Sequence, residues 1–160
     1  MSVNVVVNVS DMRISADPGD TLATYSLGSC IGVSAYDASA RVGGLLHFQL
    51  PTSTLDPKRA QAQPLMFADS GVAAMLAALE SAGARKQRLR VKLAGAAQIL
   101  NDNNLFNIGR RNHAAVRKVL WQHGLFVDSE AIGGSAPRTM YLAIADGTVT
   151  VKTQGEALTL

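Results

Sequence analysis

The chain contains one cysteine, Cys30, which follows Gly28 and Ser29 in the stretch LGSC. A glycine and a serine between two apolar segments predict a sharp corner, where a side chain can point into a cleft and backbone N–H groups stay unpaired. A cysteine nucleophile needs a thiolate, a neighbouring base and donors for an oxyanion. Cys30 is therefore a candidate nucleophile, with Gly28 and Ser29 as backbone oxyanion donors. Because free cysteine is also among the most buried residue types, Cys30 could equally be a small core residue.

His47 is the natural candidate for the base. It lies 17 residues after Cys30, and a hairpin at residues 37–41 would return the chain beside the cysteine. Its strand alternates, so that Leu45 and His47 share one face. A histidine on an apolar strand is more often a core residue than a base, so the hypothesis depends on the pair. Thr24, in the strand before the cysteine, is the candidate hydroxyl that would orient the imidazole.

The remaining sequence offers little other chemistry. His113 lies among arginines and His123 at the end of a predicted helix, and no His, Cys, Asp or Glu cluster has metal-ligand spacing. The glycine-containing segments at 93–100 and 132–138 lack both phosphate-binding patterns, GxxxxGK[ST] and GxGxxG. We therefore expect neither a metal ion nor another cofactor.

Composition is typical of a globular protein, with 48% hydrophobic and 17% charged residues among 160, and we expect one domain over residues 1–160. The net charge is only +3, and the most basic stretch, 85–92, alternates with apolar residues like a strand with one solvated face. With few aromatic residues, this argues against nucleic-acid binding. We find no membrane-spanning run or secretory signal, and a lone cysteine suits a reducing compartment, so we expect a cytoplasmic protein.

Apolar patterns predict the elements that would position these residues. Strands are expected at 3–9, 21–27, 31–36, 42–50, 89–95, 125–132, 138–144 and 148–153, and helices within 65–83 and 107–124. Residues 51–64 contain three prolines and predict a long loop. Gly43-Gly44 predicts a bulge or a close backbone approach, and Asp146-Gly147 a hairpin turn. This order favours a mixed, largely antiparallel α+β fold.

Six segments together resemble the CheD family of chemoreceptor glutamine deamidases. They are TYSLGSC (24–30), VGGLLHFQLP (42–51), FADSGV (67–72), VKLAGAAQIL (91–100), NIGRRN (107–112) and IGGSAPR (132–138). LGSC followed by HFQLP at this spacing is the most specific. The resemblance implies a layered β-sandwich flanked by helices and related to the catalytic domain of cytotoxic necrotizing factor toxins. Ala96 departs from the family, which usually has a second glycine there.

The resemblance implies that Cys30, His47 and Thr24 form the catalytic site of a protein-glutamine glutaminase. His47 would lower the pKa of the Cys30 thiol, and a thioester intermediate would convert glutamines of the cytoplasmic helical bundle of chemoreceptors to glutamate. Some members are also credited with receptor methylesterase activity, and some bind a CheC-type phosphatase. We expect a monomer that neither binds nucleic acid nor inserts into a membrane. The alternatives are a regulatory module that docks and stimulates such a phosphatase, and a cysteine amidase or peptidase with other substrates.

Overall fold

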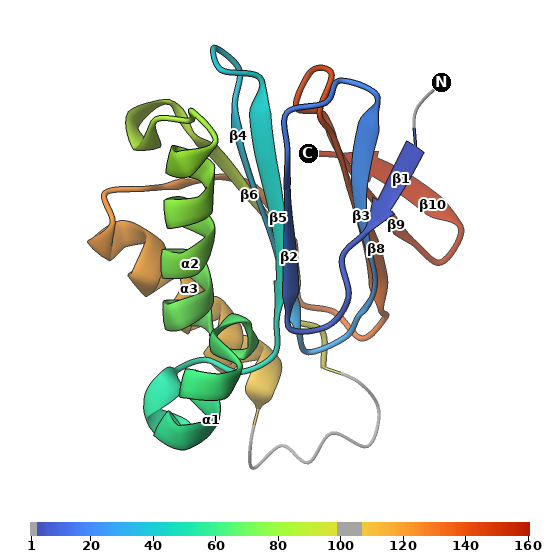
Figure 1. Ribbon diagram of the computed structural model, residues 1–160. Coiled ribbons are helices and arrows are strands. Elements are labelled where there is room, and N and C mark those ends of the chain that lie inside the picture. Colours follow the sequence, from blue (N-terminus) through green and yellow to red (C-terminus); the bar gives the residue numbers. More distant parts are fainter. Residues whose placement is uncertain (1–2, 99–106) are drawn as a thin grey trace.

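Two five-stranded sheets pack face to face in a computed structural model that describes residues 3–98 and 107–160 (Figure 1). The first sheet has the order β1 (Val3–Val6), β3 (Asp20–Leu27), β8 (Arg138–Ala143), β9 (Val149–Thr153), β10 (Glu156–Thr159). The second has the order β2 (Asp11–Ser15), β5 (Val42–Phe48), β4 (Ile31–Asp37), β6 (Arg90–Gly95), β7 (Val127–Ile132). The outer face of this second sheet is covered by the helices α2 (Ala68–Ser81) and α3 (Ile108–Gln122), and α1 (Pro57–Ala62) lies on the same side, below α2 in Figure 1.

The pairing of the strands confirms a mixed, largely antiparallel α+β fold. Only the β1–β3 and β6–β7 pairs are parallel, and the other ladders are antiparallel. The predicted hairpins at 37–41 and Asp146-Gly147 join β4 to β5 and β8 to β9. No helix in the described ranges is both long and apolar enough to cross a membrane.

The central strands of the second sheet, β4 and β5, are buried on both faces, and their side chains divide between two apolar layers. Along β5, Leu46 and Phe48 pack toward the helices, whereas Leu45 packs toward the first sheet. Burying each such side chain contributes about 1.5–3 kcal/mol, so both layers stabilise the central strands. His47 follows the same alternation as Leu45 and therefore enters the layer between the sheets.

Gly43 and Gly44 mark a close approach and not a bulge, because the β4–β5 register runs through them without a shift. A Cβ at Gly43 would lie 2.9 Å from Cδ1 of Ile144, and one at Gly44 would lie 2.5 Å from Cδ1 of Ile14. A side chain at either position would therefore push apart neighbours on opposite faces of β5.

Asp37 anchors the β4–β5 hairpin with a fully buried carboxylate. Burial favours its neutral form, but hydrogen bonds from Arg88 and from the backbone of Arg85 and Ala40 outweigh burial and lower the Asp37 pKa to about 2. The ion pair with Arg88 has an N–O distance of 2.9 Å. Arg88 lies in a 3₁₀ turn, Lys86–Arg88, and β6 begins only at Arg90. The prediction that Arg88 belongs to a solvated strand face was therefore wrong.

Several elements escaped prediction from the sequence. β2 and β10 were not expected, and β1 ends at Val6 and not at residue 9. The expected loop at 51–64 contains α1 between two 3₁₀ turns, Ser53–Leu55 and Pro64–Met66. α1 has no buried residue, and it begins with Pro57 after Asp56, whose carboxylate accepts the N–H of Arg59 at 3.1 Å. Because this six-residue helix buries no side chain, its sequence has no apolar residues at helical spacing from which the helix could be predicted.

Candidate active site

Thr24 and His47 meet between the two sheets. Thr24 lies in β3 of the first sheet and His47 in β5 of the second, and the Oγ1–Nδ1 distance is 2.7 Å. Both side chains are completely buried. The pairing of these residues, predicted from the sequence, is thus a direct contact that links the two layers of the sandwich.

The same threonine determines which ring nitrogen of His47 carries the proton. Its hydroxyl donates to the backbone oxygen of Val7 at 2.8 Å. A hydroxyl has a single proton, so toward His47 the oxygen acts as an acceptor, and Nδ1–H of the imidazole is the donor. This leaves Nε2 unprotonated in the neutral ring. Nε2 has no hydrogen-bond partner among the described residues, so its lone pair is available.

Burial keeps His47 neutral. The ring is removed from water, and this desolvation lowers the pKa of His47 from 6.5 to about 4. At neutral pH the side chain is therefore an unprotonated imidazole. Thr24 orients it as the tautomer in which Nε2 can accept a proton.

Cys30 is half-buried at the residue before β4 begins, and it packs against the apolar layer between the sheets. Gly32, two residues later and on the same face, pairs directly with His47 in the β4–β5 ladder. A Cβ at Gly32 would lie 3.5 Å from Cγ2 of Thr24, so this glycine faces the same space as the threonine. Cys30 itself lies one residue before the strand that pairs with β5, and no hydrogen bond joins the thiol to Nε2.

The expectation that His47 lowers the pKa of the thiol was wrong. Burial raises the pKa of Cys30 above its usual value of 9.0, and the residue's own backbone N–H, which faces the sulfur, opposes this only in part. Since burial also lowers the pKa of His47, both groups are neutral at pH 7. The physical reason is that a thiolate–imidazolium pair would need two charges in a largely apolar layer.

The corner at residues 28–30 supplies one of the two expected oxyanion donors. The N–H of Gly28 donates to the Ser26 oxygen at 3.0 Å, so it is already engaged. The Ser29 N–H forms no hydrogen bond with any residue that the structure describes, and the Cys30 N–H faces only the sulfur of its own residue. The available donors are therefore those of Ser29 and Cys30, and the expected contribution of the Gly28 N–H was wrong.

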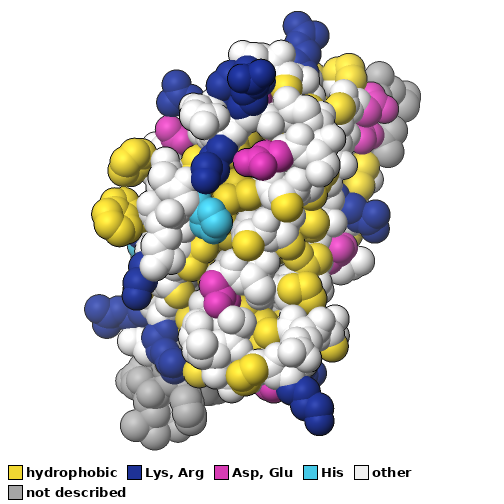
Figure 2. All heavy atoms as spheres, turned by 60° about the vertical axis from the view of Figure 1, so that its left-hand side comes forward, with side chains coloured by type: hydrophobic (Ala, Val, Ile, Leu, Met, Phe, Trp, Pro, Cys, Tyr) yellow, Lys and Arg dark blue, Asp and Glu magenta, His cyan; other side chains and the backbone are white. Residues whose placement is uncertain are grey.

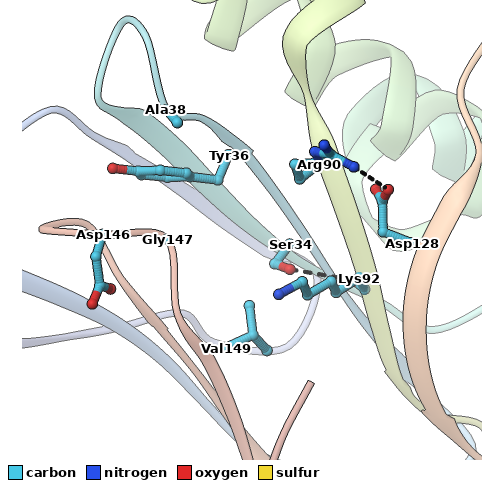
Figure 3. Close-up of a pocket in the computed structure, with 9 residues that line it drawn as sticks. All are labelled: Ser34, Tyr36, Ala38, Arg90, Lys92, Asp128, Asp146, Gly147 and Val149. Atoms are coloured by element: carbon cyan, nitrogen blue, oxygen red, sulfur yellow. Dashed lines mark hydrogen bonds and ion pairs between the residues drawn. The ribbon is translucent and has the colours of Figure 1, made fainter.

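The other ionisable clusters lie away from this corner. A pocket of about 310 Å³ lies at the opposite end of β4, where Arg90 pairs with Asp128, and Asp146 points from the β8–β9 turn (Figure 3). Asp146 accepts the Thr148 N–H at 2.9 Å, so the acidic groups there have local partners. His113 pairs with Glu130 at 3.0 Å. Within the described ranges, no three His, Cys, Asp or Glu side chains are grouped so as to hold a metal ion.

The surface over the helices combines hydrophobic side chains with scattered lysines and arginines (Figure 2). Trp121, near the end of α3, is 68% exposed, and Phe126, just before β7, is 74% exposed. With Leu125 and Arg117 they line a hollow of about 410 Å³. This surface lies at the end of α3 farther from Cys30, because Asn112, in the first half of the helix, is the residue that contacts the backbone beside the cysteine.

Thr24→Val should change the tautomer of His47 and weaken the fold. Valine keeps the shape of threonine but leaves Nδ1–H buried without an acceptor, so we expect a loss of about 1–3 kcal/mol of unfolding free energy. Thr24→Ser keeps the hydroxyl and should retain the wild-type tautomer. Nitrogen-15 NMR of the imidazole distinguishes the two forms, and the chain has only three histidines. Wild-type His47 protonated at Nε2 would contradict the assigned direction of these hydrogen bonds.

The fold and this site define a class: a two-sheet α+β protein with a neutral Cys–His pair and a threonine that orients the histidine. A profile described as CheD chemotactic sensory transduction matches residues 49–153. A Syntrophus aciditrophicus protein named probable chemoreceptor glutamine deamidase CheD 1 is 45% identical over 155 residues, covering 97% of each chain. Similarly named relatives from Solibacter usitatus and Anaeromyxobacter dehalogenans are 42% and 43% identical, over 95% and 92% of this chain and 90% and 93% of their own. The chain belongs to the CheD family.

Proposed function

We propose that this protein is a chemoreceptor glutamine deamidase, which hydrolyses the side-chain amide of selected receptor glutamines to glutamate. The observation that carries the proposal is the buried His47, held by Thr24 with Nε2 free, on the strand paired with the one that follows Cys30. The full-length relatives named for this activity point to the same substrate class.

The proposed reaction starts from the neutral pair, so proton transfer accompanies attack. Nε2 of His47 takes the thiol proton as Sγ of Cys30 bonds to Cδ of the glutamine, and the carbonyl electrons move to oxygen. The N–H groups of Ser29 and Cys30 stabilise this oxyanion. When the tetrahedral intermediate collapses, the C–N bond breaks and His47 protonates the leaving nitrogen, giving ammonia and a thioester.

Water completes the proposed cycle. His47 takes a proton from a water molecule that attacks the thioester carbonyl, and the second tetrahedral intermediate expels the Cys30 sulfur, which regains its proton from His47. The products are glutamate and the free thiol. Thr24 keeps its hydrogen bond to Nδ1 throughout and stabilises the imidazolium that forms transiently, so its role is one of positioning.

Further parts of the proposal follow from this chemistry and from the family. The same route applied to a receptor glutamyl methyl ester would release methanol, giving a methylesterase activity. The proposed partners are the cytoplasmic receptor bundle and a CheC-type phosphatase. We propose that the protein acts in the cytoplasm, as a monomer with a single domain of residues 1–160. We also propose that the sandwich is related to the catalytic fold of cytotoxic necrotizing factor toxins.

Mass spectrometry of a receptor cytoplasmic fragment tests the activity. Incubation with the protein should release ammonia and shift the mass of particular peptides by the replacement of NH₂ with OH at glutamine. The fragment incubated without the protein provides the background of spontaneous deamidation. An unmodified receptor fragment, together with stimulation of a CheC-type phosphatase, would favour the regulatory module. Turnover of free glutamine or cleavage of peptide bonds would favour an amidase or peptidase.

A further inference from the structure

The side chain of Asn112 joins the two strand ends that carry the candidate nucleophile and base. It projects from α3 and is completely buried. Its Nδ2 donates to the backbone oxygen of Ser29 at 2.9 Å and to that of Gln49 at 2.8 Å. Ser29 precedes the cysteine, and Gln49 lies two residues after His47. One amide therefore contacts the backbone on both sides of the site.

This contact lies where the sheet itself no longer links the two chains. The β4–β5 ladder ends at the pair Ile31–Phe48, and the N–H of Gln49 turns away to the Met66 oxygen at 2.9 Å. Beyond that pair, the two hydrogen atoms of Nδ2 take the place of the next backbone bridge. The helix can come this close because Gly109, one turn earlier, has no side chain: a Cβ there would lie 2.7 Å from the Ala96 oxygen.

The two bonds have a direct consequence for the corner at Cys30. In a trans peptide the C=O and N–H point in opposite directions, and no cis peptide is present in the described ranges. Because Asn112 holds the carbonyl of Ser29, the N–H of Cys30 in the same peptide must point to the other side. There it faces the Cys30 sulfur and forms no hydrogen bond with another described residue. The Ala97 N–H holds the Gly28 carbonyl at 2.8 Å, so the Ser29 N–H of that peptide points away from Ala97.

We propose that Asn112 is a positioning residue that fixes the Ser29–Cys30 peptide so that the Cys30 N–H stabilises the oxyanion. The inference rests on the proposed role of Cys30 as the nucleophile. It explains why a side chain with two hydrogens on one nitrogen is needed. Aspartate would present an oxygen to two carbonyl oxygens, and leucine would leave both carbonyls buried without a donor.

Two reagents that need no receptor separate an oxyanion effect from a general effect on the thiol. p-Nitrophenyl acetate acylates a cysteine through a tetrahedral oxyanion: the sulfur bonds to the carbonyl carbon, and the C–O bond to p-nitrophenolate breaks. Iodoacetamide alkylates the same sulfur by displacing iodide from a saturated carbon, so no oxyanion forms. Cys30 is the sole cysteine, so the part of each rate that Cys30→Ala abolishes reports on this thiol alone. The ratio of the two rates measures stabilisation of the oxyanion.

For Asn112→Leu we expect the acylation rate to fall about 100-fold while the alkylation rate changes less than about threefold. Asn112→Ser, which is smaller and admits water to the two carbonyls, should show the same direction and serves if the leucine variant does not fold. Val116→Ala, at a buried position one turn further along α3, is the matched control and should keep the wild-type ratio. All rates are measured at a temperature where circular dichroism shows each variant folded.

A wild-type ratio in a folded Asn112 variant would overturn the inference, and so would a parallel fall of both rates, because a parallel fall shows a disturbed thiol and not a displaced donor. The outcome is independent of the receptor. If the ratio falls as expected while receptor glutamines stay unmodified by the wild type, the proposed function fails and the role of Asn112 stands. If receptor glutamines are converted and the ratio does not fall, only the role of Asn112 fails.

Discussion

Replacement of Cys30 by alanine is expected to abolish the release of ammonia from a receptor fragment, with a fall of at least about 1,000-fold in rate. The variant lacks the atom that would bond to the glutamine carbonyl, and no other cysteine is present to replace it. The rate is measured as ammonia release and as the mass of the target peptides. Alanine is smaller than cysteine and Cys30 is only half-buried, so we expect a stability loss of about 1 kcal/mol or less.

Two controls make this result specific. Circular dichroism and thermal unfolding should show that Cys30→Ala keeps the fold, and binding to the receptor fragment should persist because only the sulfur is removed. Deamidation by a folded Cys30→Ala protein at more than a tenth of the wild-type rate would rule out the cysteine mechanism.

His47→Asn is expected to lower the deamidation rate by about 100- to 10,000-fold, the usual contribution of a general base. Asparagine can still donate to Thr24, but it has no Nε2 to accept the thiol proton. The same variant should also change how stability depends on pH, which provides a measurement independent of any substrate. His123→Asn, the same substitution at the end of α3, is the matched control and should retain the wild-type deamidation rate.

The direction of the pH effect follows from the His47 pKa, which is about 4 in the folded protein and 6.5 in the unfolded chain. Between these values the unfolded chain binds a proton that the folded protein does not. The contribution of His47 to the free energy of unfolding is therefore complete above pH 6.5. It falls as the pH decreases, by about 2.5 kcal/mol at pH 4.5. His47→Asn should lack this decrease. Urea unfolding at pH 7.5 and pH 4.5 measures it, and an equal decrease in both proteins would refute the assigned burial of a neutral imidazole.

Asp37 does not obscure that measurement, because its effect appears in a different pH range. Its pKa is lowered from 3.8 to about 2, so the folded state holds the charged form more tightly than the unfolded chain does. Stability from this carboxylate is present above pH 3.8 and is lost only as the pH falls toward 2. The interval from 6.5 to 4.5 therefore isolates His47 from Asp37.

Local patterns in the sequence were sufficient for the strands and helices that bury one regular face. The expected positions of four elements were close to the observed ones: β3, β4, β5 and α3. In these elements apolar residues repeat every 2 or about 3.6 positions, and this spacing indicates which side chains are buried. The same local reasoning placed Cys30 and His47 on strands joined by a hairpin, since the turn at 37–41 determines the pairing. β2 and α1 lack such an alternation, because neither has a fully buried residue.

By itself, then, the sequence determined the class of fold, the hairpin that pairs the strands of the candidate site, and the family through its motifs. Only the tertiary structure decided which ring nitrogen of His47 carries the proton, because this depends on the hydrogen bond from Thr24 to the Val7 carbonyl, 17 residues away. The tertiary structure also decided that the thiol and the imidazole are neutral, and which backbone N–H groups of residues 28–30 are free to donate. It brings Asn112 to the backbone of Ser29, 83 residues earlier in the chain. Burial and long-range hydrogen bonds depend on how all the elements pack together, so no local pattern of residues in the sequence predicts them.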